Sequence, residues 1–165
     1  MKLLASLAPL AIAVTASPVQ NIFSLVSSGA SDDSHNGLYL STQHTDPLNS
    51  NAVFRDAGDA ADYYLINGTV RYDAPNGAPY ALALVSGDDV QGDVEISVSP
   101  SSGSTGFSLT SDNTLATVNE HWGGWLVCDG TDGLLGLYYE NHSAGNGVPD
   151  DCDSIKLDAV YKTTS

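Results

Sequence analysis

The sequence predicts a single-domain, all-β protein, built as an antiparallel β-barrel or sandwich, with a β-trefoil as the alternative topology. Residues 94–99 and 155–162 alternate apolar and polar side chains, which is the period of half-buried strands. Residues 63–66 and 69–72 flank Asn67-Gly68, the dipeptide that best accepts the positive φ angles of a tight hairpin. No stretch of helical period is longer than about two turns. Many short strands at this spacing favour a barrel or a sandwich.

The other expected strands are bounded by Gly, Pro, Asn, Asp or Ser, which are typical of turns. They are residues 21–27, 37–42, 80–85, 105–110, 114–119, 122–128 and 134–139. Residues 56–62, with the sequence DAGDAAD, are expected as a short helix or turn. Residues 99–106 are rich in Ser and Gly, and we expect a long exposed loop there.

The first 16 residues have the features of a secretory signal peptide. Lys2 precedes an apolar run from Leu3 to Val14, and Val14 and Ala16 offer signal peptidase the small side chains it needs. We expect cleavage after Ala16 and one mature domain over residues 17–165. The apolar run is too short to cross a membrane, and no later stretch approaches the ~20 apolar residues of a membrane helix. The sequence therefore predicts a secreted, extracellular protein with no membrane partner.

The chain is strongly acidic, with 20 Asp and Glu residues against 5 Lys and Arg and a formal net charge of −15. Such a surface repels phosphate backbones, so nucleic acid is excluded as a partner. Most carboxylates are interpreted as a solvated surface that maintains solubility. Weak calcium binding is left open at two acidic stretches, comprising Asp88, Asp89, Asp93 and Glu95, and Asp150, Asp151 and Asp153.

Cys128 and Cys152 are the only cysteines in the chain. We expect them to form a disulfide, because an exported protein enters an oxidising compartment and no third thiol competes. Two isolated thiols without a Cys-x-x-Cys motif or a nearby pair of histidines make a poor zinc site. No metal site is therefore predicted.

Two Asn-x-Ser/Thr motifs predict N-glycosylation in a secreted protein, at Asn67 and Asn141. Both lie at predicted turns, where an enzyme can reach the side chain. Turn formation alone explains an Asn-Gly dipeptide at residue 67. Asn141 lies in a polar stretch inside the predicted disulfide loop, so it is the stronger of the two predictions.

Residues 121–130, HWGGWLVCDG, contain both tryptophans of the chain. Side chains three residues apart point to opposite faces of a regular strand, unless Gly123-Gly124 bends or bulges the chain. We therefore expect Trp125 in the core beside the disulfide and Trp122 at the surface. An exposed tryptophan can stack on a sugar ring, which makes Trp122 a candidate carbohydrate contact.

Catalytic signatures are weak in this sequence. The histidines at 35, 44, 121 and 142 have no metal-binding spacing, and no Gly-x-Ser-x-Gly elbow occurs. Paired carboxylates of the glycosidase type cannot be told from chance among so many acids. With no cofactor motif either, we predict a non-enzymatic protein with no catalytic residues and no cofactor.

Several short motifs, in this order along the chain, resemble the phialide-type cell-wall proteins of filamentous fungi. They are residues 22–26 (IFSLV), 61–68 (ADYYLING), 106–109 (GFSL) with 113–115 (NTL), 125–128 (WLVC), and Asp151-Cys152 before a final alternating strand. The resemblance covers most of the mature chain, although members of that family often have more cysteines. It implies a small secreted protein of the wall, associated with conidium-forming cells, and it brings no catalytic residues.

We therefore expect a non-enzymatic, cell-wall-associated fungal protein that acts in phialide or conidium development. Its expected partners are wall polysaccharide or wall proteins, and homo-oligomerisation is left open. Three alternatives remain at this point: a small effector or elicitor that binds a host protein, a lectin-like carbohydrate-binding module, and an acid-stable hydrolase.

Overall fold

A computed structural model of the chain describes residues 21–98 and 103–162. It confirms the all-β class, with 51% strand and 6% helix. The predicted signal peptide and part of the predicted loop at 99–106 lie outside the described residues. Within these two ranges, no helix is both long and apolar enough to cross a membrane.

The described ranges contain twelve strands and three short 3-10 turns. The strands are β1 (Phe23–Ser28), β2 (Tyr39–His44), β3 (Asn49–Arg55), β4 (Tyr63–Ile66), β5 (Thr69–Tyr72), β6 (Ala81–Leu84), β7 (Gln91–Ser97), β8 (Phe107–Leu109), β9 (Leu115–Thr117), β10 (Trp122–Asp129), β11 (Leu135–Asn141) and β12 (Cys152–Tyr161). The turns are η1 (Asp33–His35), η2 (Ala57–Asp59) and η3 (Thr131–Gly133). The turn η2 lies inside residues 56–62, where a short helix or turn is expected from sequence.

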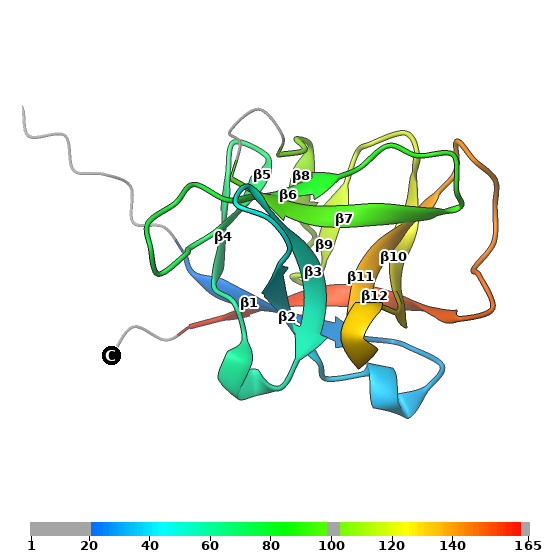
Figure 1. Ribbon diagram of the computed structural model, residues 1–165, viewed down its shortest axis with the longest axis horizontal. Helices are drawn as coiled ribbons and strands as arrows, with labels where there is room; N and C mark the ends of the chain where they lie inside the picture. Colours follow the sequence, from blue (N-terminus) through cyan, green and yellow to red (C-terminus); the bar gives the residue numbers. More distant parts are fainter. Residues whose placement is uncertain (1–20, 99–102, 163–165) are drawn as a thin grey trace, which may run out of the picture.

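Ten of these strands form one antiparallel sheet that closes on itself (Figure 1). The order is β10-β12-β1-β2-β3-β11-β7-β6-β5-β4, and further pairings join β10 to β11, β1 to β4 and β3 to β7. Strands β8 and β9 pair only with each other within the described residues. Of the topologies that the sequence leaves open, the structure confirms the closed antiparallel barrel.

The barrel interior is filled by the apolar half of each alternating strand. In β12, Ile155, Leu157 and Ala159 are buried while the residues between them are more exposed. Trp125 and Tyr63 are among the largest fully buried side chains. Burying apolar surface is the main favourable term in folding, so this alternation is what holds the sheet closed.

The predicted hairpin at Asn67-Gly68 is present between β4 and β5. Both turn residues have positive φ, 50° for Asn67 and 72° for Gly68. Ile66 and Thr69 face each other across the turn as register partners. Only residues that tolerate a left-handed backbone fit such a two-residue turn, which is why the dipeptide is informative in the sequence.

The predicted disulfide between Cys128 and Cys152 is confirmed. The two cysteines are register partners on the adjacent strands β10 and β12, with Cα atoms 4.1 Å apart. The bond therefore links the last strand of the chain to the strand that carries both tryptophans.

The prediction that Trp122 and Trp125 point to opposite faces is wrong. The four residues of β10 from Trp122 to Trp125 lie opposite only three residues of β11, from Asn141 to Tyr139, so β10 has a bulge at Gly123-Gly124. The extra residue brings both rings to the same face, where their centroids lie 5.5 Å apart in an edge-to-face contact. Trp122 is partly buried against the core cluster.

Candidate functional site

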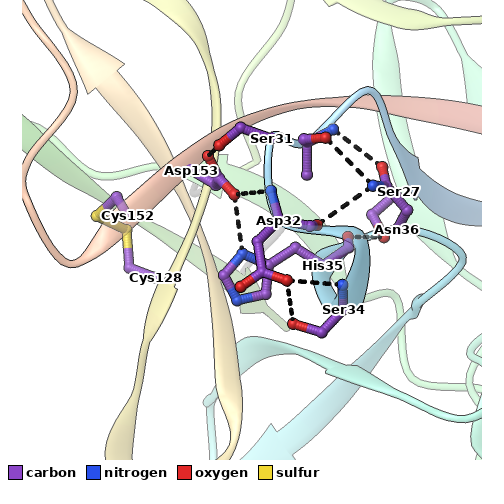
Figure 2. Close-up of polar contacts among 10 residues, drawn as sticks. Ser27, Ser31, Asp32, Ser34, His35, Asn36, Cys128, Cys152 and Asp153 are labelled. Carbon is purple, nitrogen blue, oxygen red and sulfur yellow. Dashed lines mark hydrogen bonds and ion pairs between the residues drawn. A yellow bond between two sulfur atoms is a disulfide. The ribbon is translucent and has the colours of Figure 1, made fainter.

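A polar cluster joins the loop after β1 to the first residues of β12, next to the disulfide (Figure 2). Asp153 accepts a hydrogen bond from the Ser31 hydroxyl at 2.5 Å and one from the backbone N–H of Asp32 at 2.9 Å. The Nδ1 atom of His35 lies 3.2 Å from the same carboxylate. The hydrogen bond from Ser31, followed by that from Asp32, lowers the pKa of Asp153 to about 2.

Although this cluster contains a serine, a histidine and an aspartate, its geometry is not that of a nucleophile. In a catalytic triad the histidine accepts the serine proton and the aspartate holds the histidine. Here the hydroxyl of Ser31 and the imidazole of His35 both contact Asp153. The cluster is therefore interpreted as a clamp that fixes the 29–38 loop to β12.

A second candidate site is a cleft on the outer face of the barrel, where three strands meet. Strand β7 pairs with β3 at Glu95 and Asn51, and with β11 at Asp93 and Tyr138. It changes partner between these two residues, and a cleft of about 240 Å³ lies at this change of partner. Because alternate residues of a strand share a face, Asp93 and Glu95 both lie on the solvent side.

Tyr138 divides this cleft from a neighbouring hollow of about 480 Å³, and the two share Asp93 and Tyr138. The second hollow is also lined by Asp89, Gln91 and Pro149. We call the two together the junction groove. Its two hollows adjoin at Asp93 and Tyr138, on the outer face of β7 and β11.

Glycine at position 136 sets the position of the Tyr138 ring. A Cβ atom at Gly136 would lie 2.7 Å from a ring carbon of Tyr138, so the ring lies directly over this glycine. Burial, then the nearby carboxylates of Asp93 and Asp151, raises the pKa of Tyr138. At neutral pH the ring therefore presents an uncharged phenol to the groove.

The carboxylates of the junction groove have no cationic partner among the described residues. Neither Asp93 nor Glu95 takes part in any of the ion pairs or side-chain hydrogen bonds found there. The described Arg71 and Lys162 side chains are engaged with the Pro79 carbonyl and with Asp62. The groove thus offers free acceptor oxygens beside an aromatic ring.

The structure places the carbohydrate candidate Trp122 outside this groove. Its ring makes an edge-to-face contact with Trp125, and its Nε1 atom is buried without a hydrogen-bond partner in the described part of the chain. Trp122 is partly buried against the core cluster, and its contact with carbohydrate stays a prediction.

The predicted glycosylation of Asn141 is also corrected. This side chain is 1% exposed, and its Nδ2 donates to the carbonyls of Gly87 and Asp89 at 3.0 and 3.1 Å. A glycan is attached through this nitrogen, so it would break one of these bonds and would have no exit from the fold. Asn67 lies exposed on the hairpin turn, and its glycosylation stays a prediction.

No group of three or more His, Cys, Asp or Glu side chains is placed to hold a metal ion in the described ranges. The carboxylates of the two acidic stretches left open for calcium belong to different sites. Asp89, Asp93 and Glu95 line the junction groove, whereas Asp153 belongs to the clamp.

The sequence singled out Asp89, Asp93 and Glu95 of the groove only as acids open to weak calcium binding, and it did not group them with Tyr138 or Asn51. Tyr138 and Asp93 are 45 positions apart, and Asn51 lies on a strand that the sequence did not reveal. The alternation that puts Asp93 and Glu95 on one face of their strand was the available signal.

The chain belongs to a family described as a domain of unknown function (DUF7907), whose model matches residues 20–161. No curated protein matches the chain. No solved structure matches it either.

Proposed function

We propose that this protein is a non-enzymatic, extracellular protein that binds polysaccharide of the fungal cell wall through the junction groove. The disulfide supports an oxidising compartment, because such bonds persist mainly outside the cytosol. The resemblance to phialide-type proteins supports the wall and conidium-forming cells as its place of action. The shape and chemistry of the groove support polysaccharide as the ligand.

The observation that carries the proposal is that two hollows adjoin on the outer face of the barrel and share Asp93 and Tyr138. Small-molecule sites are generally single concavities that enclose most of their ligand. Two adjoining hollows beside two paired strands suit successive units of a linear polymer.

The side chains of the groove match the chemistry of a sugar. The apolar face of a pyranose ring stacks on an aromatic side chain such as Tyr138. Sugar hydroxyls donate to carboxylate and amide oxygens, which Asp93, Glu95 and Asn51 provide. This is the chemistry of a lectin-like module. The proposed function therefore combines the lectin-like alternative with association with the cell wall. No feature of the described surface specifically favours a host protein.

The same geometry favours binding over hydrolysis. A glycosidase needs one carboxyl group that stays protonated, usually because apolar surroundings raise its pKa. Asp93 is exposed on the outer face of the barrel, and Glu95 is only partly buried there. The hydrolase alternative would require a more enclosed pair of acids.

Cosedimentation with insoluble β-glucan, chitin and purified fungal wall tests the proposal. The Tyr138→Ala variant should lose roughly three- to tenfold in affinity for the polymer that the wild type binds, as expected for one lost stacking contact. Tyr64→Ala is the matched control, because Tyr64 is also a half-buried tyrosine on a strand but lies outside the groove. Equal retention of wild type and Tyr138→Ala would contradict the groove as the binding surface.

A further inference from the structure

A third cavity, of about 270 Å³, lies on the inner side of the sheet at the end of the β2–β3 hairpin. We call it the tyrosine pocket. Two aromatic rings, Tyr72 and Tyr80, line it together with Thr42, His44, Ser50, Ala74, Pro75 and Asn76. It shares no residue with the junction groove.

The pocket exists because the side chains on the core face of the β2–β3 hairpin become smaller and more polar toward its turn. Leu40 and Phe54 are register partners in the core, and the next inward pairs are Thr42 with Ala52 and His44 with Ser50. The large apolar side chains that fill the barrel are missing at these last two pairs. The inner face therefore continues as an open pocket instead of a packed core.

The loop between β5 and β6 forms the opposite wall and is fixed by its own hydrogen bonds. The Asn76 side-chain oxygen accepts from the backbone N–H of Ala78 at 3.0 Å, next to Gly77, whose φ is 70°. The Arg71 guanidinium donates to the Pro79 carbonyl at 3.1 Å. A wall held in this way is preorganised, which lowers the entropy cost of binding a ligand.

The aromatic wall is a continuous row of rings. The centroids of Tyr72 and Tyr80 are 5.9 Å apart with a tilt of 48°, and behind Tyr72 the buried Tyr63 lies at 6.0 Å. Tyr72 is held in place by this contact and presents its other side to the pocket. Two tilted rings at the surface make a shallow apolar corner, which suits the C–H face of a ring-shaped ligand.

The polar groups around this corner are hydrogen-bond donors and acceptors. They are the hydroxyls of Thr42 and Ser50, the imidazole of His44 and the Asn76 amide nitrogen. No carboxylate, lysine or arginine lines the pocket, although the chain carries a net charge of −15. This lining selects a neutral ligand with hydroxyl groups around an apolar face.

We infer that the tyrosine pocket is a second binding site and that it takes one neutral pyranose unit. Ligand pockets generally range from about 300 to 1,000 Å³, so this cavity of about 270 Å³ is at the small end and suits a single sugar ring. Ser50 faces the pocket while its neighbour Asn51 faces the junction groove, which puts the two sites on opposite sides of β3. A protein with a site on each side of β3 can bridge two polysaccharide chains. This bridging function rests on the proposed function of the groove.

Titration with the methyl glycosides of glucose, mannose, galactose and N-acetylglucosamine tests the pocket directly. With ¹⁵N-labelled protein, at least one glycoside should shift the backbone signals of Thr42, Tyr72 and Asn76 in a saturable way. The Tyr80→Leu variant, which keeps an apolar side chain, should bind that glycoside roughly three- to tenfold more weakly. Asn76→Ala should also weaken binding.

Asn146→Ala is the matched control for Asn76→Ala, because Asn146-Gly147 is another exposed Asn-Gly dipeptide and lies outside the pocket. Its affinity for the glycoside should equal that of the wild type. If none of the four glycosides shifts the pocket signals, or if Tyr80→Leu is folded and binds with unchanged affinity, the inference is overturned. Shifts with phenol but with no glycoside would overturn it as well.

The bridging function has a separate readout. Wild-type protein should clump particles of the polysaccharide that it retains, whereas Tyr80→Leu should still sediment with them without clumping them. A glycoside that saturates the pocket, together with full polymer binding by Tyr138→Ala, would contradict the proposed function of the groove. The same result would support the pocket as a separate binding site. Clumping by Tyr80→Leu at the wild-type level would overturn the role of the pocket in bridging.

Discussion

Trp125 and Trp122 lie side by side, but they differ in the packing of their rings and in the hydrogen bonding of their indole N–H groups. Trp125 is 2% exposed and its Nε1 donates to the Leu115 carbonyl at 2.7 Å. Its ring also stacks on Phe107 with centroids 6.2 Å apart. Trp122 has only the edge contact with Trp125, and its Nε1 lacks a partner among the described residues.

We therefore expect Trp125→Ala to lower the free energy of unfolding by about 3–5 kcal/mol, because it leaves a core cavity. Trp122→Ala should cost less than half of that loss, since part of its ring is already in water. Urea unfolding followed by tyrosine fluorescence or circular dichroism measures both. Equal losses in the two variants would show that Trp122 is as much a core residue as Trp125.

Asp153 is the residue whose ionisation most clearly supports the fold. Its pKa falls from 3.8 to about 2 because the carboxylate accepts hydrogen bonds from Ser31 and the Asp32 backbone. A lowered pKa means that the ionised form stabilises the folded state above pH 3.8. This stabilisation is lost as the pH falls toward 2.

The Asp153→Asn variant should accordingly melt at a lower temperature than the wild type at neutral pH. The difference in Tm should shrink as the pH falls from 3.8 toward 2, because the wild-type carboxylate then becomes protonated. Thermal melts over this pH range, monitored by circular dichroism, measure it. A Tm difference that stays constant through the range would contradict a role for the charge.

Among the elements, β10 and β12 are held together both by pairing and by the Cys128–Cys152 disulfide. The bond closes a loop with a sequence separation of 24 residues. Restricting such a loop in the unfolded chain stabilises the folded state by roughly 3–4 kcal/mol. Replacing both cysteines with alanine should therefore lower the unfolding free energy by about this amount.

Urea unfolding of this double variant and of the reduced wild type should give similar midpoints, both below that of the oxidised protein. The comparison separates the loss of the covalent link from the loss of the two sulfur atoms, of which that of Cys128 belongs to a buried residue. Oxidised and reduced wild type with the same midpoint would contradict the stabilising role of the disulfide.

The strands with a clear alternation or a turn dipeptide could be predicted from the sequence, and β3 could not. Residues 49–55, NSNAVFR, begin with three polar residues, and their inward positions are Ser50, Ala52 and Phe54. Small inward side chains hide the period of a strand, because burial here depends on neighbouring strands. Both candidate binding sites use β3, so missing this strand also concealed them.

The bulge in β10 and the buried amide of Asn141 were hidden for a related reason. A Gly-Gly pair permits a bulge without requiring one, and pairing with β11 decides the outcome. Similarly, an Asn-x-Ser motif describes what an enzyme recognises and not whether the side chain folds inward. In both cases the conformation is determined by contacts between segments that are distant in the sequence. No local sequence pattern predicts these contacts.

In the molecule as a whole, the barrel places two surfaces of different chemistry on opposite faces of its sheet. The junction groove on the outer face is lined by carboxylates and Tyr138, and the tyrosine pocket on the inner face by hydroxyl, amide and imidazole groups and two rings. Closure of the sheet keeps these surfaces fixed relative to β3, because each β3 residue faces one side only. A rigid scaffold with open, preformed surfaces is suited to adhesion through several weak contacts.

Titration of ¹⁵N-labelled protein with soluble oligosaccharides of β-glucan and of chitin, followed through the backbone signals, tests whether wall polysaccharide binds along the outer face of β7 and β11, as we propose. One of these series should shift Asn51, Asp93 and Tyr138 together. Longer oligosaccharides should bind more tightly, and the sugar should be recovered uncleaved. Shifts confined to other surfaces, or cleavage of the oligosaccharide by the purified protein, would contradict this proposal.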